Sequence, residues 1–327
     1  HSNWVIMQIL IEAGLPPGVI NFLPGSGSEI ATAALANPDL AGVHFTGSSS
    51  TFRTLWENIA NCLSTLRNYP RIVGETGGKD FIIAHPDCDE QALLVALLRG
   101  AFEYQGQKCS AASRAYIPHS IWERIGESLV AETKSIPMGD PTDFTNFMSA
   151  VIDQRAFDKI SGYIERARGD SSCEIIVGGG SDDSKGWFIE PTIILSSNPR
   201  SEPMVQEIFG PVLTIHLYDD SSFEEILVEC DAASPYALTG SIFSSNEENI
   251  ERAFEALRFS AGNFYINDKP TGAVVAQQPF GGARASGTND KAGSPLNLMR
   301  WISPRSVKRS LDPPTEWRYS FMEPDEL

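Results

Sequence analysis

Short apolar segments alternate with helical ones along most of the chain, and this alternation constrains the fold more than any other feature. Three segments have the length and apolar content of buried strands, and each is followed by a polar connection and a helical segment; they are 40–45, 80–84 and 115–118. Parallel strands need a long crossover between them, and that crossover is usually a helix. The alternation therefore predicts an α/β fold built on a parallel sheet.

The same reading extends to both ends of the chain. The first predicted helix stops at Gly14, where Pro16 and Pro17 follow. We predict helices over 4–13, 28–37, 51–66, 87–104, 120–133, 153–167, 222–230 and 247–257. We predict further strands over 19–23, 71–74, 174–177, 212–218, 238–243 and 262–266.

Length and charge restrict the classes of function. A chain of 327 residues is too long for one compact core and suits two domains. Its 25 basic and 42 acidic residues leave a net charge of −17, which argues against nucleic acid or an anionic membrane surface as the main partner. No apolar run approaches the length of a membrane span.

The cysteines and histidines give no sign of a metal site or a disulfide framework. The five cysteines are scattered, odd in number and without CxxC spacing, and the five histidines form no ligand pattern. We therefore predict no metal, and we expect a reducing compartment.

Cys109 has the sequence surroundings of a nucleophile. It is preceded by Lys108 and followed by Ser110; a nearby cation lowers a thiol pKa, and small neighbours leave the sulfur accessible. Glu75 stands on the glycine-rich turn 75–79 and can serve as a general base. Because most cysteines are small buried hydrophobes, this pattern alone decides little.

Glycine turns after strands suggest a phosphate site. Gly47 and Ser48 follow a predicted strand and open a helix, whose first amides can face a phosphate. By itself this signal is weak. A second turn at 25–27 lacks the third glycine of a GxGxxG fingerprint because Ile30 occupies that position.

Five motifs taken together resemble the ordered set of the aldehyde dehydrogenase superfamily. They are Phe-Thr-Gly-Ser at 45–48, Glu-Thr-Gly-Gly-Lys at 75–79, Gly-Gln-Lys-Cys at 106–109, Glu-Ile-Phe-Gly-Pro at 207–211 and Pro-Phe-Gly-Gly at 279–282. The resemblance implies part of a Rossmann-like NAD-binding domain at 1–77 and an α/β catalytic domain at 78–283. It also implies a return segment with an oligomerisation strand at 284–312 and a polar tail at 313–327.

Three longer segments, 101–111, 264–269 and 277–290, resemble the Δ1-pyrroline-5-carboxylate dehydrogenase family within this superfamily. That resemblance implies NAD-dependent oxidation of L-glutamate γ-semialdehyde to L-glutamate in proline catabolism. It also implies a homo-oligomer in the mitochondrial matrix, joined through a strand near 301–310.

Catalytic and cofactor roles follow from the resemblance. Cys109 would attack the aldehyde carbon, with its own backbone N–H as one donor to the oxyanion, and a thioester would follow. Glu75 would activate the water that hydrolyses this thioester. Gly47 and Ser48 would lie near the pyrophosphate and nicotinamide of NAD. Glu207 would hold the nicotinamide ribose, with Phe209 beside it.

Substrate roles follow in the same way. Gly272 and Ala273 match the aldehyde-anchor loop, whose backbone amides can bind the substrate carboxylate, while Ser110 and Phe280 line the site. Many relatives have serine at the position of Ala273, so a hydroxyl contact would be lost there. Lys108 would either attract the anionic substrate and acidify Cys109 or point into solvent.

The resemblance also implies that the chain begins inside the cofactor domain. The asparagine that supplies the second oxyanion donor and the lysine of the adenosine-ribose site would precede His1. We therefore expect these 327 residues alone to be inactive or nearly so, with an exposed sheet edge. Two alternatives remain: an enzyme for another semialdehyde or aliphatic aldehyde, and a truncated paralogue that binds nucleotide or partner subunits without catalysis.

Overall fold

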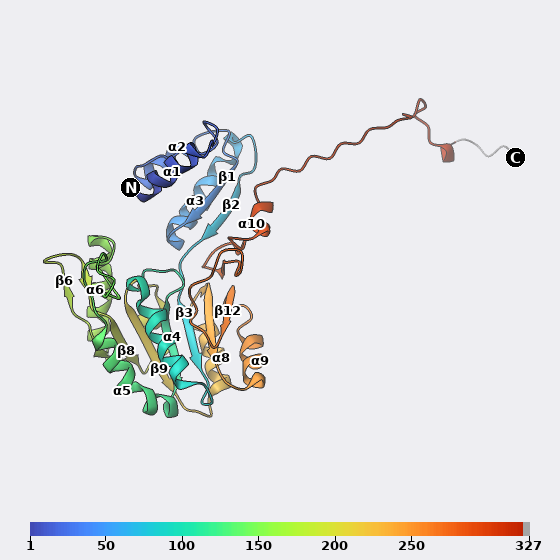
Figure 1. Cartoon of the computed structure of the whole chain (residues 1–327). Helices are drawn as coiled ribbons and strands as arrows, with labels where there is room; N and C mark the ends of the chain where they lie inside the picture. Colours follow the sequence, from blue (N-terminus) through green and yellow to red (C-terminus); the bar gives the residue numbers. More distant parts are fainter. Residues whose placement is uncertain (323–327) are drawn as a thin grey trace.

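The computed structural model describes residues 1–322, so the end of the predicted polar tail, 323–327, lies outside the described residues. Figure 1 shows a small N-terminal unit above a larger α/β unit, with the C-terminal segment running away from both. The two units are joined where β2 passes into β3 and where the chain returns after β12.

The small unit holds two parallel strands with helices beside them. The strands are β1 (Gly42–Thr46) and β2 (Arg71–Glu75). The helices are α1 (Ser2–Glu12), α2 (Gly27–Leu35) and α3 (Ser49–Cys62), followed by the turn η1 (Leu63–Thr65). A small core of Leu35, Phe52, Leu55, Ile59 and Ile72 joins α2, α3 and β2.

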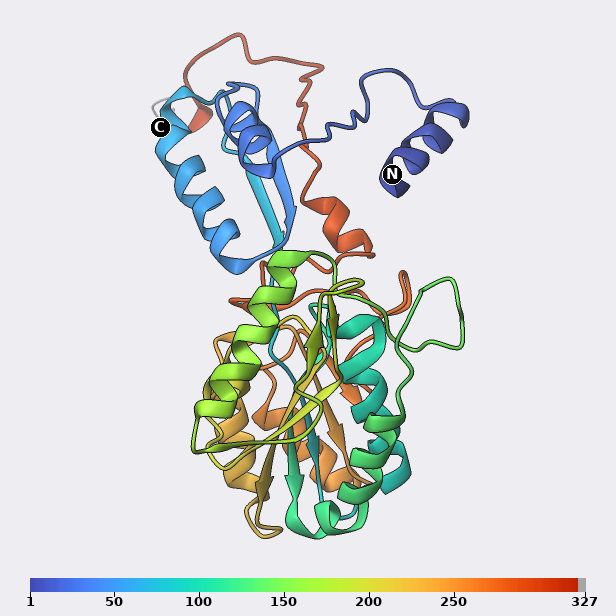
Figure 2. The ribbon, with the colours of Figure 1, turned by 90° about the vertical axis from the view of Figure 1, so that its left-hand side faces the viewer.

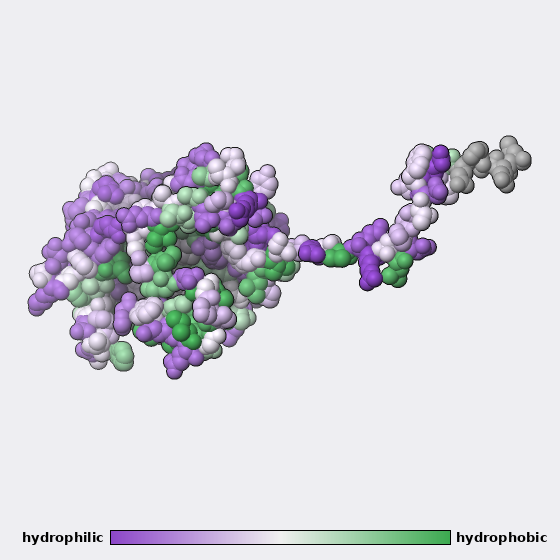
Figure 3. Space-filling view, turned by 90° about the horizontal axis from the view of Figure 1, so that it is seen from above, coloured by the Kyte–Doolittle hydropathy of each residue, from purple (hydrophilic) through white to green (hydrophobic). Residues whose placement is uncertain are grey.

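Helix α1 stands apart from this core. None of its residues is buried, and Figure 2 shows it separated from α2 and α3. Its apolar side chains include Trp4, Ile6 and Ile9, which are all exposed. Figure 3, viewed from above, shows apolar surface among polar groups on this side of the molecule.

The larger unit is built on a seven-stranded sheet in the order β12-β11-β3-β4-β9-β8-β5. Every pair is parallel except β5 with β8. The strands are β3 (Asp80–Ala84), β4 (Ala112–Pro118), β5 (Cys173–Val177), β8 (Thr192–Ser196), β9 (Val212–Tyr218), β11 (Thr239–Phe243) and β12 (Asn263–Ile266). The predicted α/β fold with a parallel sheet is confirmed.

Helices cover both faces because side chains alternate along each strand. Ile82 faces a cluster with α4 (Glu90–Phe102) and α5 (His119–Ser135). Phe81 and Ile83 face a second cluster with α8 (Phe223–Ala232) and α9 (Glu247–Ala256). Helix α6 (Gln154–Gly169) packs on a third cluster beside β8. Each fully buried aliphatic side chain stabilises the fold by about 1.5–3 kcal/mol.

Short elements complete the fold. They are η2 (Glu103–Gly106), β6 (Ser181–Asp182), β7 (Phe188–Ile189), α7 (Glu202–Val205), β10 (Tyr236–Ala237), β13 (Ala283–Arg284), α10 (Pro295–Met299) and η3 (Ser320–Met322). None of the helices in residues 1–322 has the length and apolar character needed to cross a membrane.

Apart from the short elements, two segments differ from the sequence predictions. The strand predicted over 19–23 is wrong: these residues form bends and irregular chain, and Val19 and Leu23 are exposed. An apolar run becomes a strand where a neighbour supplies ladder hydrogen bonds, and within residues 1–322 no strand pairs with this one. The strand β8 was not predicted.

The segment 301–310 has no strand assignment in the described chain and is exposed throughout. Its predicted role as an oligomerisation strand stays a prediction.

Candidate active site

A cleft of about 830 Å³ lies where the small unit meets the amino ends of β3 and β4. All eleven residues predicted for the site line this cleft; they are Gly47, Ser48, Glu75, Lys108, Cys109, Ser110, Glu207, Phe209, Gly272, Ala273 and Phe280. They come from segments up to 233 positions apart, between 47 and 280. The structure thus brings the predicted residues together, while their individual roles remain proposals.

Cys109 lies on a loop whose backbone is strained and held in place. After α4, Gln105 and Gly106 take positive φ angles of 57° and 61°. A Cβ at Gly106 would lie 2.2 Å from the carbonyl oxygen of Gly210, so no larger residue fits. The Gln105 side chain donates a hydrogen bond to the Ala150 carbonyl at 3.1 Å. Backbone strain of this kind persists where surrounding contacts enforce it, as at catalytic loops.

The electrostatic surroundings of Cys109 differ from the sequence prediction. Burial, and after it the charges of Asp80, Glu207 and Glu75, raises the pKa of the Cys109 thiol to about 12. Lys108 forms an ion pair with Glu103 at 2.9 Å. The prediction that a neighbouring cation lowers this pKa is therefore wrong, because the thiol is buried, three carboxyl groups lie close and Lys108 is paired with Glu103.

Glu75 ends β2 and faces the cleft with little solvent contact. Its side chain is 7% exposed, and neither carboxylate oxygen has a hydrogen-bond partner in the described residues. Burial raises its pKa to about 7, although the charge of Lys291 opposes this rise and that of Asp290 adds to it. A carboxyl group that titrates near neutral pH is suited to general-base work.

Glu207 and Phe209 lie on the loop before β9. The backbone N–H of Gly78 donates to Glu207 Oε1 at 3.0 Å, and Lys159 Nζ donates to the Glu207 carbonyl at 3.1 Å. Burial raises the pKa of Glu207. Phe209 has a positive φ of 62° and exposes 38% of its surface. A fixed carboxylate and an exposed ring therefore lie side by side in the cleft.

The predicted anchor loop is tied to the nucleophile loop. Ser110 Oγ and Thr271 Oγ1 are 2.8 Å apart, and both residues are buried. Lys269 Nζ donates to the Thr271 carbonyl at 3.3 Å and lies 3.8 Å from Glu103, which also holds Lys108. These contacts connect the segment 108–110 to the segment 269–273.

Several charged residues of the site were missed by sequence reasoning. Asp80 is almost fully buried near Cys109, and Lys79, the last residue of the motif at 75–79, is almost fully buried one position before it. The Thr239 N–H donates to Asp80 Oδ1 at 2.6 Å, and burial raises the pKa of this aspartate to about 8. Burial lowers the pKa of Lys79 to about 7. An aspartate opening an apolar strand was the available signal.

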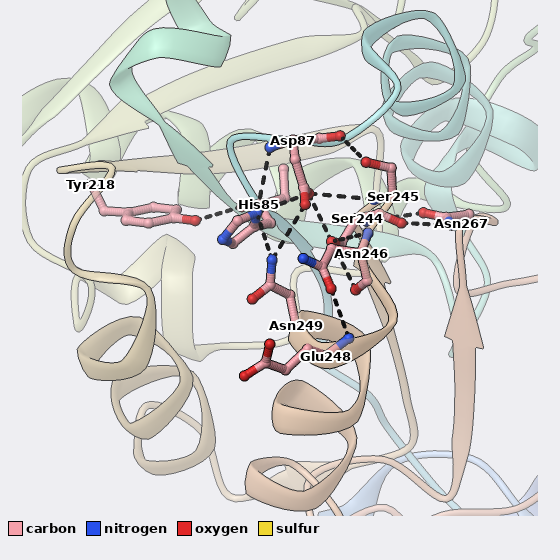
Figure 4. Close-up of polar contacts among 10 residues, drawn as sticks. His85, Asp87, Tyr218, Ser244, Ser245, Asn246, Glu248, Asn249 and Asn267 are labelled. Carbon is pink, nitrogen blue, oxygen red and sulfur yellow. Dashed lines mark hydrogen bonds and ion pairs between the residues drawn. The ribbon is translucent and has the colours of Figure 1, made fainter.

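The opposite end of the sheet holds a cluster of polar side chains that contact one another. Figure 4 shows His85 and Asp87 after β3, with Ser244 and Ser245 after β11, linked by mutual contacts. Asn249 of α9 donates to Asp87 Oδ2 at 3.3 Å. The structure therefore uses these groups to join β3, β11 and α9, which agrees with a structural role for His85.

The chain is similar in sequence to proteins of known function. The profile of the Aldehyde dehydrogenase family matches residues 1–307. The mitochondrial Δ1-pyrroline-5-carboxylate dehydrogenase of Dictyostelium discoideum is 56% identical over 98% of this chain and 58% of its own length. The mitochondrial enzyme of the same name from Homo sapiens is 46% identical over 98% of this chain and 57% of its own length.

Solved structures give the same result. The Δ-pyrroline-5-carboxylate dehydrogenase from Mycobacterium tuberculosis bound with NAD has a TM-score of 0.92 and 51% identity, covering 98% of this chain and 59% of that chain. The present chain thus spans about 58% of the length of the curated relatives it matches. With the family profile covering 1–307, the chain belongs to the aldehyde dehydrogenase family.

Proposed function

We propose that the protein oxidises L-glutamate γ-semialdehyde, the open form of Δ1-pyrroline-5-carboxylate, to L-glutamate with NAD, as a step of proline catabolism. The observation that carries the proposal is the shared cleft, in which Cys109 and Glu75 face the Gly272–Ala273 loop. Relatives named Δ1-pyrroline-5-carboxylate dehydrogenase, at 46–56% identity, support this choice of substrate. Their mitochondrial names favour the mitochondrial matrix for this protein as well.

Cys109 is proposed as the nucleophile. Its sulfur adds to the aldehyde carbon, and the carbonyl oxygen becomes an oxyanion that the Cys109 backbone N–H can stabilise. The thiol must first lose its proton, and its pKa of about 12, raised by burial, makes this unfavourable. Glu75, with a pKa of about 7, is proposed to activate the water that hydrolyses the thioester.

The cleft offers a donor set that fits a dinucleotide. Gly47 and Ser48 stand at the start of α3, where helix N-termini favour phosphate, and Ser48 caps the helix by accepting the Thr51 N–H. The Glu207 carboxylate suits ribose hydroxyls, and the Phe209 ring offers an apolar contact. When bound, NAD would supply the hydride acceptor.

The Gly272–Ala273 loop is proposed to bind the substrate carboxylate through backbone amides. Gly272 has a φ of 93°, a backbone conformation that residues other than glycine rarely adopt. Lys269 Nζ lies 3.0 Å from the point where a Cβ at Gly272 would stand. Ala273 offers no hydroxyl, so the backbone and the nearby lysine carry recognition of the anion.

Gly272→Val is expected to raise KM for the semialdehyde roughly 10- to 100-fold, the value of losing one hydrogen bond to a charged group. The physical reason is that the new side chain displaces the loop and its amides. Steady-state kinetics with the semialdehyde and with propionaldehyde measure the effect, and KM for the uncharged aldehyde should change much less. Gly169→Ala, at a position with open space, is the control. Equal loss for both aldehydes would contradict the anchor role.

The proposed function is tested with the whole gene product, including any coding sequence upstream of His1. The assay measures NADH and glutamate after addition of Δ1-pyrroline-5-carboxylate, with Cys109→Ala as the inactive reference. Turnover of aliphatic aldehydes without glutamate formation would instead support an enzyme for another aldehyde. NAD binding without any turnover would support a non-catalytic paralogue.

The division into an NAD-binding part at 1–77, a catalytic domain at 78–283 and a return segment at 284–312 is proposed on the same basis. A homo-oligomer is also proposed, formed through 301–310, which is exposed here over its whole length. Sedimentation of the gene product with and without residues after 300 tests this assembly.

A further inference from the structure

The carboxylate of Glu75 is buried without a hydrogen-bond donor. Its two oxygens have no partner in residues 1–322, and the residue is only 7% exposed to solvent. A buried charge without donors is costly unless another charge compensates it. A base that must be ionised to act therefore needs a compensating cation close by.

The segment 286–292 wraps around the end of β2, where Glu75 stands. The Thr76 N–H donates to the Ser286 carbonyl at 2.9 Å, and the Thr288 N–H donates to the Gly74 carbonyl at 3.0 Å. Glu75 itself forms a β-bridge with Gly287. These bonds fix the segment on both sides of the carboxylate, so the residues that follow are placed with little freedom.

Lys291 is held near Glu75 by this segment and by two backbone carbonyls. Its ammonium donates to the carbonyls of Gly262 at 2.6 Å and Gly281 at 2.9 Å. A Cβ at Gly281 would lie 2.9 Å from Glu75 Oε1 and 3.3 Å from the Lys291 backbone nitrogen. Gly281 therefore lies between Lys291 and the Glu75 carboxylate. Lys291 also has a positive φ of 52°, a conformation retained only where surroundings enforce it.

We propose that Lys291 is a positioning residue for the reaction: its fixed ammonium compensates the negative charge of the buried Glu75 carboxylate, which has no hydrogen-bond donor in residues 1–322. The inference rests on the proposed function, because it assumes that Glu75 activates the hydrolytic water. It adds to that function a cation that neither binds substrate nor lines the cleft.

The other charges around Glu75 leave Lys291 as the compensating group. Lys291 holds the pKa of Glu75 below the value that burial alone would set, whereas Asp290 raises it. Asp290 is itself engaged by Arg300 at 3.1 Å and by the Thr288 hydroxyl at 2.5 Å. Across the cleft, Cys109 has a thiol pKa of about 12 and is neutral at pH 7. Burial lowers the pKa of Lys291, and the charge of Glu75 raises it.

The test follows hydrolysis of p-nitrophenyl acetate by the whole gene product, since this ester needs neither NAD nor the semialdehyde. The burst of nitrophenol reports acylation of Cys109, and the steady rate reports hydrolysis of the acyl-enzyme. A carboxylate base acts when deprotonated, so the steady rate should rise with pH through about 7 and then level off.

In Lys291→Met the rising limb should move to higher pH by about one unit, the low end of the effect of an opposite charge at close range. The steady rate at pH 7 then falls about fivefold, recovers at higher pH, and follows a burst of normal amplitude. Lys291→Arg keeps the charge and should keep the position of the limb. Lys134→Met, an exposed lysine at the end of α5, is the control and should leave the profile unchanged.

A rate lowered equally at all pH values in Lys291→Met, with an unmoved limb, would overturn the proposal and leave Lys291 a structural residue. A shifted limb in a protein that does not oxidise the semialdehyde would uphold the inference while the proposed substrate fails. Absence of any burst in the wild-type protein would overturn both, because the inference depends on acyl chemistry at Cys109.

Discussion

Cys109→Ser is expected to lower kcat for NAD-dependent aldehyde oxidation by roughly 10⁴- to 10⁶-fold, the scale of removing a covalent nucleophile. A hydroxyl ionises far less readily than a thiol, and the surroundings of Cys109 already oppose ionisation through burial and three carboxyl groups. Steady-state NADH formation measures the loss. Electrophile labelling followed by mass spectrometry should place the modified thiol at residue 109.

Cys173→Ser is a matched control for this variant. Cys173 is partly buried like Cys109 but lies on β5, at the far edge of the sheet, near the hydroxyls of Ser172 and Ser196. The activity of the Cys173→Ser variant should stay within a factor of about two of wild type. Substitutions away from a site rarely change the free energy of unfolding by more than about 0.5 kcal/mol. If Cys109→Ser retained more than about 1% of wild-type kcat, a value far above the range cited for nucleophiles, covalent catalysis at Cys109 would be rejected.

Glu75→Gln is expected to lower the steady rate by roughly 10²- to 10⁴-fold, the usual contribution of a general base. The amide keeps the shape of the side chain but cannot take a proton from water. Acylation should still occur, so the variant should release a burst of NADH close to one per active site and then stall. Intact mass spectrometry of the stalled protein should show the added acyl group.

Glu251→Gln, an exposed carboxylate on α9, is the control for loss of charge alone. It should turn over like wild type. A Glu75→Gln protein that stalls without a burst would show that Glu75 acts before the thioester forms. In that case its assignment as the base for hydrolysis would be wrong.

Much of the fold was predictable because local patterns carried it. The strand β9 was predicted over its observed span, and α4, α5 and α9 were placed within a few residues, since each has apolar side chains at helical or strand spacing. The strand predicted over 19–23 failed for a different reason. Its apolar residues have strand character, but a strand also needs a neighbour, and in the described chain those residues have none.

The candidate site, like the fold, could be predicted from the sequence only in part. The eleven predicted site residues were found from motifs along the chain, and all of them line the cleft. The protonation states and ion-pair partners of these residues could not be predicted from their order along the chain. Lys108 stands next to Cys109 in sequence but pairs with Glu103, and Asp80 lies near the thiol through the packing of β3 against β4.

The sequence by itself determined which chemistry-bearing residues belong together, because a motif is a local string and its residue types persist whatever the fold. Only the tertiary structure decided the protonation of those residues. Burial and the distance to charges from remote segments set the pKa values of Cys109 and Glu75. Lys291, 216 positions after Glu75, is brought near it by the bonds of one returning segment. Electrostatic energy depends on separation in space and on exclusion of water, and neither can be read from order along the chain.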